Sequence, residues 1–261
     1  MKKIIIILLF PLLIFSQENN YSMYFDGEND FITLPSNPLW VLDSDFTIQT
    51  WWNKDVNSAG NALWTIGDSY QGGMCLYVSG GTTTKLSIDG DIVIEADNNP
   101  PKGEWHHYTV KREAGTITIY IDGEQELDTW DTDLVFDGDL VLGYEFYNNN
   151  NYNWCHGLVD NFEIWNIALT NEEISQYQAC FPTGEEEGLS VAWNFEEAPV
   201  EDVFSITNNG NWGQINGAAW NNDSPIQSCS DQENEETSSS SIIGDINCDG
   251  DITIDDLQLL S

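Results

Sequence analysis

Hydrophobic and polar residues alternate along much of this chain with a period of two, which is typical of β-strands. The pattern is clearest at residues 105–111 and 116–121, where β-branched and aromatic residues dominate. Ala114 and Gly115 separate these runs, and an Asp-Gly pair follows at residues 122–123. Asp-Gly beside alternating runs is a strong hairpin signal, because a type I′ turn needs positive φ at both central residues. The centre of the chain is therefore predicted to be a β-hairpin that turns again after its second strand.

Similar short apolar runs, separated by turn signals, lie on both sides of this hairpin. One helix is expected after Thr170, which can cap the first turn while Glu173 stands three residues later, as in a capping box. This helix is predicted to end near Ala179. Many short strands with one small helix favour an all-β fold, an antiparallel β-sandwich. Further strands are expected within residues 21–34, 45–53, 62–67, 74–78, 85–88, 91–96, 140–143, 157–166, 189–195 and 213–220.

Several sequence motifs follow one another in order along residues 20–229. FDG begins at Phe25, FTIQTW at Phe46, GEWHHYTVKREAGTITIYIDG at Gly103 and GLVDNFEIWN, followed by ALTNEEI, at Gly157. Taken together they resemble a laminin-G-like or pentraxin-like domain of the concanavalin A lectin type. The resemblance implies a concanavalin A-like jelly roll over residues 20–229.

Both ends of the chain differ from this central segment. Lys2 and Lys3 precede a short apolar run and then polar residues, so residues 1–16 are predicted to be a secretory signal peptide. No other apolar run approaches the ~20 residues of a membrane span. Residues 230–243 are predicted to be an acidic, Ser-rich linker. The mature protein is therefore expected to be secreted or at the cell surface, with no membrane insertion after signal cleavage.

The charge of the chain narrows its choice of partners. Its 44 acidic and 7 basic side chains give a formal net charge of −37. Such a chain repels phosphate backbones and anionic lipids, so nucleic acid and membrane surfaces are disfavoured as partners. Calcium and cationic or neutral partners suit it better, although most of these carboxylates are expected to be solvated surface charges.

The five cysteines of an exported chain favour disulfides over metal thiolates. Cys180 and Cys229 bracket one segment and are expected to pair. Cys75 and Cys155 are a second expected pair, which leaves Cys248 unpaired. Spacing alone does not fix this connectivity.

Residues 244–261 have the pattern of a calcium-binding loop. Asp245, Asn247 and Asp249 occupy positions one, three and five, a glycine stands at six, Asp251 at seven can offer its carbonyl, and Asp256 closes the loop at twelve. Asp in place of Glu at twelve, with no evident preceding helix, resembles a partial dockerin repeat. The resemblance implies bound Ca²⁺ and a possible cohesin-like partner; the alternative is an acidic disordered tail.

A second calcium site is implied by the pentraxin-like resemblance. Asp68 and Glu145 match two of the loop positions at which such domains hold calcium. Ser69 and Tyr147 stand where further acidic ligands are expected, so the pattern is incomplete. The alternative is a pair of exposed loop carboxylates. His106 and His107 are adjacent on a predicted strand and point to opposite faces, so they are not expected to share a metal ion.

The sequence favours a non-catalytic binding module. Asp160 and Glu163 are the nearest match to the carboxylate pair of glycosidases on this fold, but strand parity places them on opposite faces. Aromatic and amide side chains on an Asn-rich loop, residues 148–153, suggest recognition of an extracellular glycan or glycoprotein. The alternatives are a structural spacer and an accessory domain of a glycoside-degrading enzyme. The predicted ligand-binding residues are Tyr144, Tyr147, Asn150, Tyr152 and Trp154.

Overall fold

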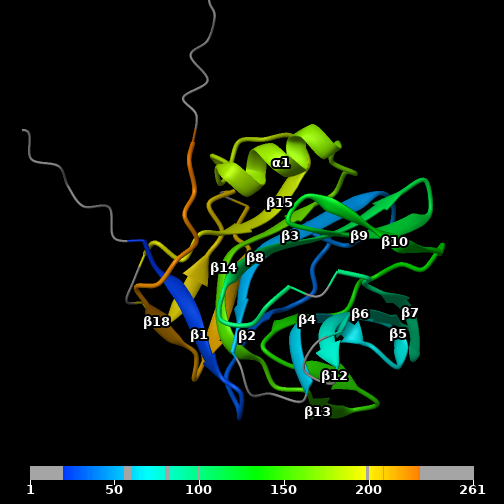
Figure 1. The fold of residues 1–261 in the computed structure, drawn as a ribbon, viewed down its shortest axis with the longest axis horizontal. Coiled ribbons are helices and arrows are strands. Elements are labelled where there is room, and N and C mark those ends of the chain that lie inside the picture. The colour runs from blue at the N-terminus through cyan, green and yellow to red at the C-terminus, as the bar shows by residue number, and fades with distance from the viewer. Residues whose placement is uncertain are drawn as a thin grey trace, which may run out of the picture. The chain divides into compact units, whose positions relative to one another are not determined.

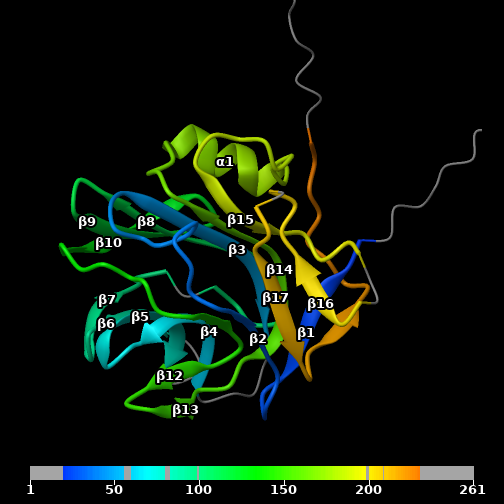
Figure 2. The ribbon, with the colours of Figure 1, turned by 180° about the vertical axis from the view of Figure 1, so that it is seen from behind.

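The computed structural model describes residues 20–55, 60–79, 83–98, 100–197, 200–207 and 209–229. These residues form two large antiparallel β-sheets packed face to face, with one helix outside the first sheet (Figures 1 and 2). This confirms the predicted β-sandwich with one short helix. The predicted signal peptide (1–16), linker (230–243) and dockerin-like repeat (244–261) lie outside the described residues.

The first sheet has the strand order β10-β9-β8-β3-β14-β1-β18, and β15 also pairs with β14. Its strands are β1 Ser22–Asp26, β3 Phe46–Lys54, β8 Trp105–Glu113, β9 Thr116–Ile121, β10 Glu124–Asp131, β14 His156–Trp165, β15 Leu189–Trp193 and β18 Ala219–Asn221.

The second sheet has the order β16-β17-β2-β11-β4-β5-β6-β7, and a separate hairpin pairs β12 with β13. Its strands are β2 Phe31–Leu34, β4 Gly60–Asp68, β5 Gln71–Ser79, β6 Thr83–Ile88, β7 Asp91–Glu95, β11 Leu140–Leu142, β16 Asp202–Phe204 and β17 Trp212–Asn216, and the separate hairpin comprises β12 Glu145–Tyr147 and β13 Asn150–Tyr152.

The predicted hairpin turns are present. Asp89, Ala114 and Asp122 all have positive φ, and each is followed by a glycine with positive φ. Paired positive φ values are what type I′ turns require, so these dipeptides set the registers of β6–β7, β8–β9 and β9–β10.

The main core fills the space between the sheets. Alternation on β3 sends Phe46, Ile48 and Trp52 inward, where they meet inward residues of the second sheet such as Trp64 and Leu76. Burial of large aromatic side chains of this kind contributes about 1.5–3 kcal/mol each before entropy is counted. Four of the eleven tryptophans, Trp40, Trp52, Trp64 and Trp193, belong to this core.

The helix α1, Asn171–Ala179, covers part of the outer face of the first sheet (Figure 1). Thr170 and Glu173 form the predicted capping box. Ile174 is the buried residue of the helix and joins Trp165 and Tyr120 in a second, smaller apolar cluster. No helix in the described part of the chain is long and apolar enough to cross a membrane.

Several predicted strands are divided differently in the structure. The run at 213–220 comprises the end of β17 in the second sheet and the start of β18 in the first. The stretch at 21–34 was predicted to hold two short strands around an Asp-Gly pair, and it contains β1 and β2, which belong to different sheets. The Asn-rich segment at 148–153, predicted as a loop, includes the turn and second strand of the β12–β13 hairpin. Strands β10 and β16 were not predicted.

The prediction that Asp160 and Glu163 face opposite sides of their strand is wrong. Asp160 pairs with Trp51 and Glu163 with Gln49, two positions of β3 that share a face. The register shifts between them, where Asn161 has a φ of 51°. This β-bulge adds one residue and so reverses the parity. Both carboxyl groups point to the outer face of the first sheet and are almost fully buried.

The expected Cys180–Cys229 disulfide is present. The expected Cys75–Cys155 disulfide is wrong, since both of these cysteines are free and buried. Cys75 lies between the inward residues Met74 and Leu76 and so points to the outer face of the second sheet. Cys155 belongs to the main core, so the sheet separates the two thiols.

Candidate functional site

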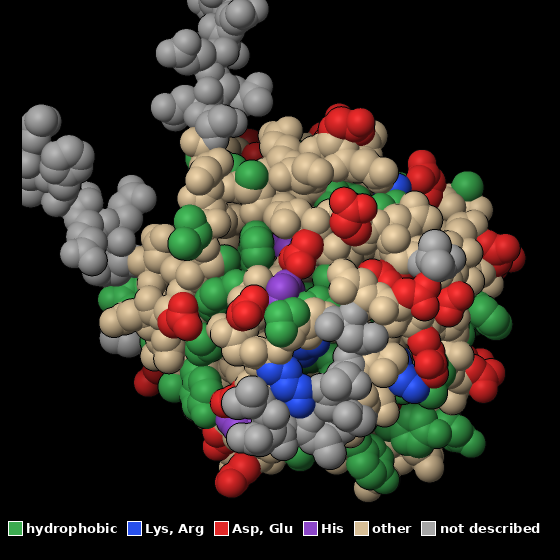
Figure 3. Space-filling model, in the orientation of Figure 1, with side chains coloured by type: hydrophobic (Ala, Val, Ile, Leu, Met, Phe, Trp, Pro, Cys, Tyr) green, Lys and Arg blue, Asp and Glu red, His purple; other side chains and the backbone are tan. Residues whose placement is uncertain are grey.

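A pocket lies on the outer face of the second sheet, beside the β12–β13 hairpin. Contacts with β4 and β5 hold this hairpin against the sheet. Figure 3 shows hydrophobic side chains, a class that includes tyrosine, gathered near the position of β12 and β13 in Figure 1. The pocket has a volume of about 340 Å³, and its lining residues are Tyr77, Ser87, Gly90, Ile92, Glu145, Tyr147, Tyr152 and Asn153.

The floor of the pocket follows from strand alternation. Leu76 and Val78 enter the core, so Tyr77 between them points outward. Ser87 points outward from β6 in the same way, between Leu86 and Ile88. The floor therefore consists of a phenol ring and a hydroxyl group.

Asp68 holds the turn of the hairpin over this floor. Its Oδ1 accepts hydrogen bonds from the backbone N–H of Asn148 at 2.8 Å and of Tyr70 at 3.0 Å, and its Oδ2 accepts one from Asn149 at 3.1 Å. Asn148 and Asn149 have φ values of 48° and 61°, as the central residues of a type I′ turn require. One carboxylate thus fixes two segments of chain that are 80 residues apart in sequence.

Glu145 provides the acidic group of the pocket. Its Oε1 accepts a hydrogen bond from Ser69 Oγ at 3.1 Å, and its Oε2 accepts one from Asn153 Nδ2 at 2.6 Å. The residue is 7% exposed, so its position is well defined. Burial, reinforced by the Glu145 charge, raises the pKa of Tyr77. The Tyr77 phenol therefore stays a neutral hydrogen-bond donor at physiological pH.

Two further tyrosine rings, Tyr147 and Tyr152, line the pocket, and Tyr70 packs against the first of them. The ring centroids of Tyr70 and Tyr147 are 4.9 Å apart, and those of Tyr147 and Tyr152 are 6.1 Å apart. Tyr70 is 45% exposed and Tyr152 is 48% exposed. Because each ring has an apolar face and a polar tip, the group can pack against a ligand and hydrogen-bond with it.

The five predicted ligand-binding residues fall into two places. Tyr147 and Tyr152 line the pocket, and Asn150 is exposed on the same hairpin, where its amide donates to the Asn148 carbonyl. Tyr144 and Trp154 instead form a separate aromatic cluster with Phe31; the Tyr144–Trp154 centroids are 4.8 Å apart. The sequence did not predict three of the residues that line the pocket, namely Tyr77, Ser87 and Ile92. Alternation along their strands does, however, predict that Tyr77 and Ser87 point outward.

The two predicted calcium ligands of the sandwich lie near each other around Ser69. Asp68 binds the backbone of the turn and Glu145 binds Ser69 and Asn153, as described above. Within the described part of the chain, no three or more His, Cys, Asp or Glu side chains are grouped so as to hold a metal ion. Calcium at Asp68 and Glu145 stays a prediction. The predicted ligands Asp245, Asn247, Asp249, Asp251 and Asp256 lie outside the described residues.

The adjacent histidines have separate environments. His106 Nδ1 lies 2.7 Å from Asp122 Oδ2. His107 is buried with its ring 5.3 Å from that of Trp51, and this burial lowers its pKa to about 3. His107 is therefore a neutral packing residue.

The fold resembles solved structures of two kinds. A Bacteroides ovatus protein to which carbohydrate binding is attributed superposes with a TM-score of 0.65 at 16% identity, covering 81% of this chain and 62% of that one. A SAP-like pentraxin from Limulus polyphemus gives a TM-score of 0.56 at 14% identity, covering 81% of this chain and 97% of that one. The chain thus spans less than two thirds of the Bacteroides ovatus structure. A comparison with curated proteins finds no match.

Two packed antiparallel sheets with one short helix form a β-sandwich of the concanavalin A-like jelly-roll type. A family model matches residues 25–175, which is more than half of the sequence. The chain belongs to that family, Laminin_G_3, of the concanavalin A-like lectin/glucanases superfamily.

Proposed function

We propose that this chain is a non-catalytic carbohydrate-binding module and that its ligand occupies the tyrosine pocket beside the β12–β13 hairpin. The main support is the grouping of Tyr147, Tyr152 and Tyr77 around a fixed acidic and amide pair, Glu145 and Asn153. Ring faces pack against the C–H faces of a sugar, while the carboxylate and amide hydrogen-bond with its hydroxyl groups. The carbohydrate binding attributed to the Bacteroides ovatus structure agrees with this proposal.

The ligand is expected to be a neutral glycan. No Lys or Arg is among the described residues that line the pocket, and Lys85, on β6 with Ser87, is engaged by Glu95 at 2.8 Å. An acidic sugar would therefore meet the Glu145 carboxylate without a compensating cation, which is unfavourable at short range.

The carboxyl groups of Asp160 and Glu163 do not alter the non-catalytic proposal. They share a face of β14, but they are 2% and 1% exposed. A substrate cannot reach acids that are covered in this way without displacing the segments above them. We also infer that the module is exported, and that its tail binds Ca²⁺; a cohesin-like partner for the tail stays a prediction.

Glycan binding is tested first with the purified chain on a glycan array, followed by titration calorimetry with the best-bound oligosaccharide. Tyr147→Ala and Tyr152→Ala are each expected to weaken binding at least tenfold, the effect of about 1.4 kcal/mol. The matched control is Trp130→Ala, which removes an aromatic side chain of similar exposure (43%) from β10 of the first sheet. Equal loss in the control, or no saturable glycan binding by the unaltered chain, would favour the spacer alternative.

A further inference from the structure

A second hollow, of about 610 Å³, opens where the chain passes from the second sheet to the first. Strand β17 ends at Asn216 in the second sheet, and β18 begins at Ala219 in the first. Gly217, with a φ of 81°, allows the sharp turn between them. The hollow is lined by residues from β16 and β17 of the second sheet and from β18 of the first, so it lies at a seam between the edges of the two sheets.

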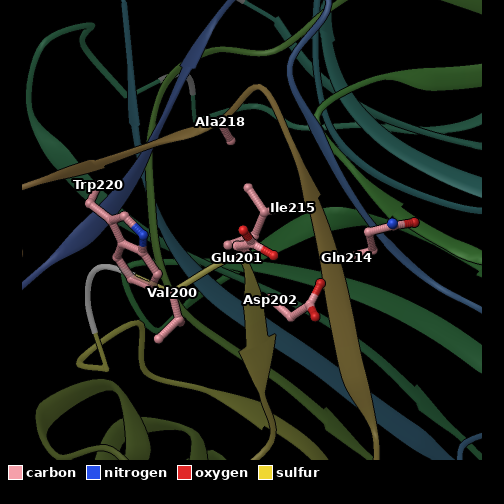
Figure 4. Close-up of a pocket in the computed structure, with 7 residues that line it drawn as sticks. All are labelled: Val200, Glu201, Asp202, Gln214, Ile215, Ala218 and Trp220. Carbon is pink, nitrogen blue, oxygen red and sulfur yellow. The ribbon is translucent and has the colours of Figure 1, made fainter.

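The walls of the hollow combine apolar and acidic groups. Figure 4 shows Trp220 on one side and Ile215 and Asp202 on the other, with Glu201 between them. Ile215 and Trp220 pack against the main core from the two sheets, so these walls are held by the fold. Trp220 also makes edge-on ring contacts with Tyr21 and Phe195, each at a centroid distance of 6.3 Å.

The hairpin beside the hollow exposes two large aromatic rings. Phe204 on β16 and Trp212 on β17 are direct cross-strand partners and are 53% and 44% exposed. The next pair on the same face is Asp202 with Gln214, and both of these residues line the hollow. An exposed aromatic pair next to a carboxylate and an amide repeats the chemistry of the tyrosine pocket.

The charge at the seam restricts what can bind. The described residues that line the hollow include Glu201 and Asp202 and no Lys or Arg. Carboxylates accept strong hydrogen bonds from hydroxyl groups and repel anions. Figure 3 shows that acidic side chains are spread over the visible face of the molecule while basic ones are few. The seam is therefore complementary to a ligand rich in hydroxyl groups and free of acidic groups.

The Asp202–Gln214 pair at the seam and the tyrosine pocket lie on the same face of the second sheet. One row of cross-strand partners runs from Gln214 to Ser87, through Thr33, Val141, Thr65 and Cys75. Five strand spacings of ~4.8 Å separate the ends of this row by about 24 Å. The intervening part of the face carries the β12–β13 hairpin.

We propose that the seam hollow and the exposed rings of Phe204 and Trp212 form a second subsite for neutral glycan, separate from the tyrosine pocket. This inference rests on the proposed carbohydrate-binding function. Trp212 and Phe204 pack against sugar rings, and Asp202, Glu201 and Gln214 hydrogen-bond with hydroxyl groups. With two subsites on one face, the module binds a polysaccharide more tightly than a short oligosaccharide.

The test is affinity electrophoresis of the purified chain in gels containing barley β-glucan, xylan, galactomannan or arabinan, with alginate as the acidic comparison. The polysaccharide that retards the unaltered chain most is then used with Trp212→Ala, Asp202→Asn and Tyr152→Ala. Asp202→Asn keeps the shape of the side chain, and a thermal melt of each variant reports its folding.

Trp212→Ala and Asp202→Asn are each expected to raise the dissociation constant for the polysaccharide at least tenfold, while Tyr152→Ala leaves residual binding. Calorimetry with a short oligosaccharide of the same sugar is expected to show two binding sites per unaltered chain and one binding site per chain of Trp212→Ala.

One outcome would overturn the second subsite and leave the proposed glycan-binding function standing. In that outcome Tyr152→Ala abolishes retardation, while folded Trp212→Ala and Asp202→Asn bind the polysaccharide as the unaltered chain does. The second subsite is also overturned if alginate is retained as strongly as the neutral polysaccharides through Trp212, or if the Trp212 surface binds polylysine and no glycan. If none of the neutral polysaccharides retards the unaltered chain, the subsite and the proposed function are both overturned.

Discussion

At the scale of single residues, burial determines which charged groups change their properties. Glu163 is fully enclosed on the outer face of the first sheet, where its Oε2 accepts hydrogen bonds from Gln49 Nε2 at 2.6 Å and Trp165 Nε1 at 2.8 Å. Burial raises its pKa from 4.5 to about 8, although these hydrogen bonds oppose the shift. The folded protein therefore holds a neutral Glu163 at pH 7.

This raised pKa predicts that stability falls as pH rises. Below pH 4.5 Glu163 is protonated in both the folded and unfolded states; between pH 4.5 and 8 the unfolded state loses this proton and the folded state keeps it. The contribution of Glu163 to stability is thus complete below pH 4.5 and is lost by pH 8. Over this range the free energy of unfolding falls by up to about 1.4 kcal/mol per pH unit. Glu163→Gln is expected to gain stability relative to the original chain between pH 4 and pH 8 in denaturant melts.

Glu172→Gln, an exposed change on α1, is the control for this pH series. An unchanged pH slope in Glu163→Gln would mean that Glu163 is ionised in the folded protein.

At the scale of elements, the β12–β13 hairpin depends on a residue from another part of the chain. Few backbone hydrogen bonds join this two-stranded element to the second sheet; one of them runs from Ser69 N to Phe146 O at 2.9 Å. The Asp68 carboxylate accepts two more hydrogen bonds from the turn, from the N–H groups of Asn148 and Asn149. The hairpin, and with it Tyr147 and Tyr152, is therefore positioned by β4.

Asp68→Ala is expected to lower the unfolding free energy by about 1–3 kcal/mol, because it leaves backbone N–H groups without their acceptor. It is also expected to weaken glycan binding without altering any ring of the pocket. Thermal melts with calcium and with chelator measure the loss of stability. They also separate the role of Asp68 as a hydrogen-bond acceptor for the turn from its predicted role as a calcium ligand. A calcium-dependent rise in melting temperature that Asp68→Ala and Glu145→Ala both remove would establish the predicted metal site; an equal loss with and without calcium would establish the capping role.

At the scale of the whole molecule, one covalent bond joins distant parts of the chain. The Cys180–Cys229 disulfide follows α1 and closes a segment that includes β15 to β18. Strands β16 and β18 are edge strands of the two sheets, and together with β17 they line the seam hollow. The bond therefore restricts the unfolded chain in the part of the sandwich that lines the seam hollow.

Reduction of this disulfide is expected to lower the unfolding free energy by about 4 kcal/mol, the loop-closure value for a segment of this length. A melt with and without dithiothreitol measures the loss, and the Cys180→Ser/Cys229→Ser double variant should be insensitive to the reductant. Cys75 and Cys155 are buried with raised pKa values, so they should not react with a thiol reagent until the protein unfolds. Their reaction in the native protein would contradict this placement.

The sequence by itself determined the local features of this protein. The strand at 116–121, the Asp-Gly turns and the Thr170 capping box depend on neighbouring residues only, so alternation and turn chemistry predict them correctly. The aromatic and amide residues of the β12–β13 hairpin were recognisable as candidates for the same reason.

Only the tertiary structure decided which segments meet. The sheet assignments of β17 and β18 follow from the turn at Gly217, and the shared face of Asp160 and Glu163 follows from a single bulged residue. Tyr77 joins Tyr147 and Tyr152 across 70 or more residues of chain, because β4 and β5 carry the later hairpin. Long-range pairing of this kind depends on the register of the whole sheet, in which one added residue turns every later side chain to the opposite face.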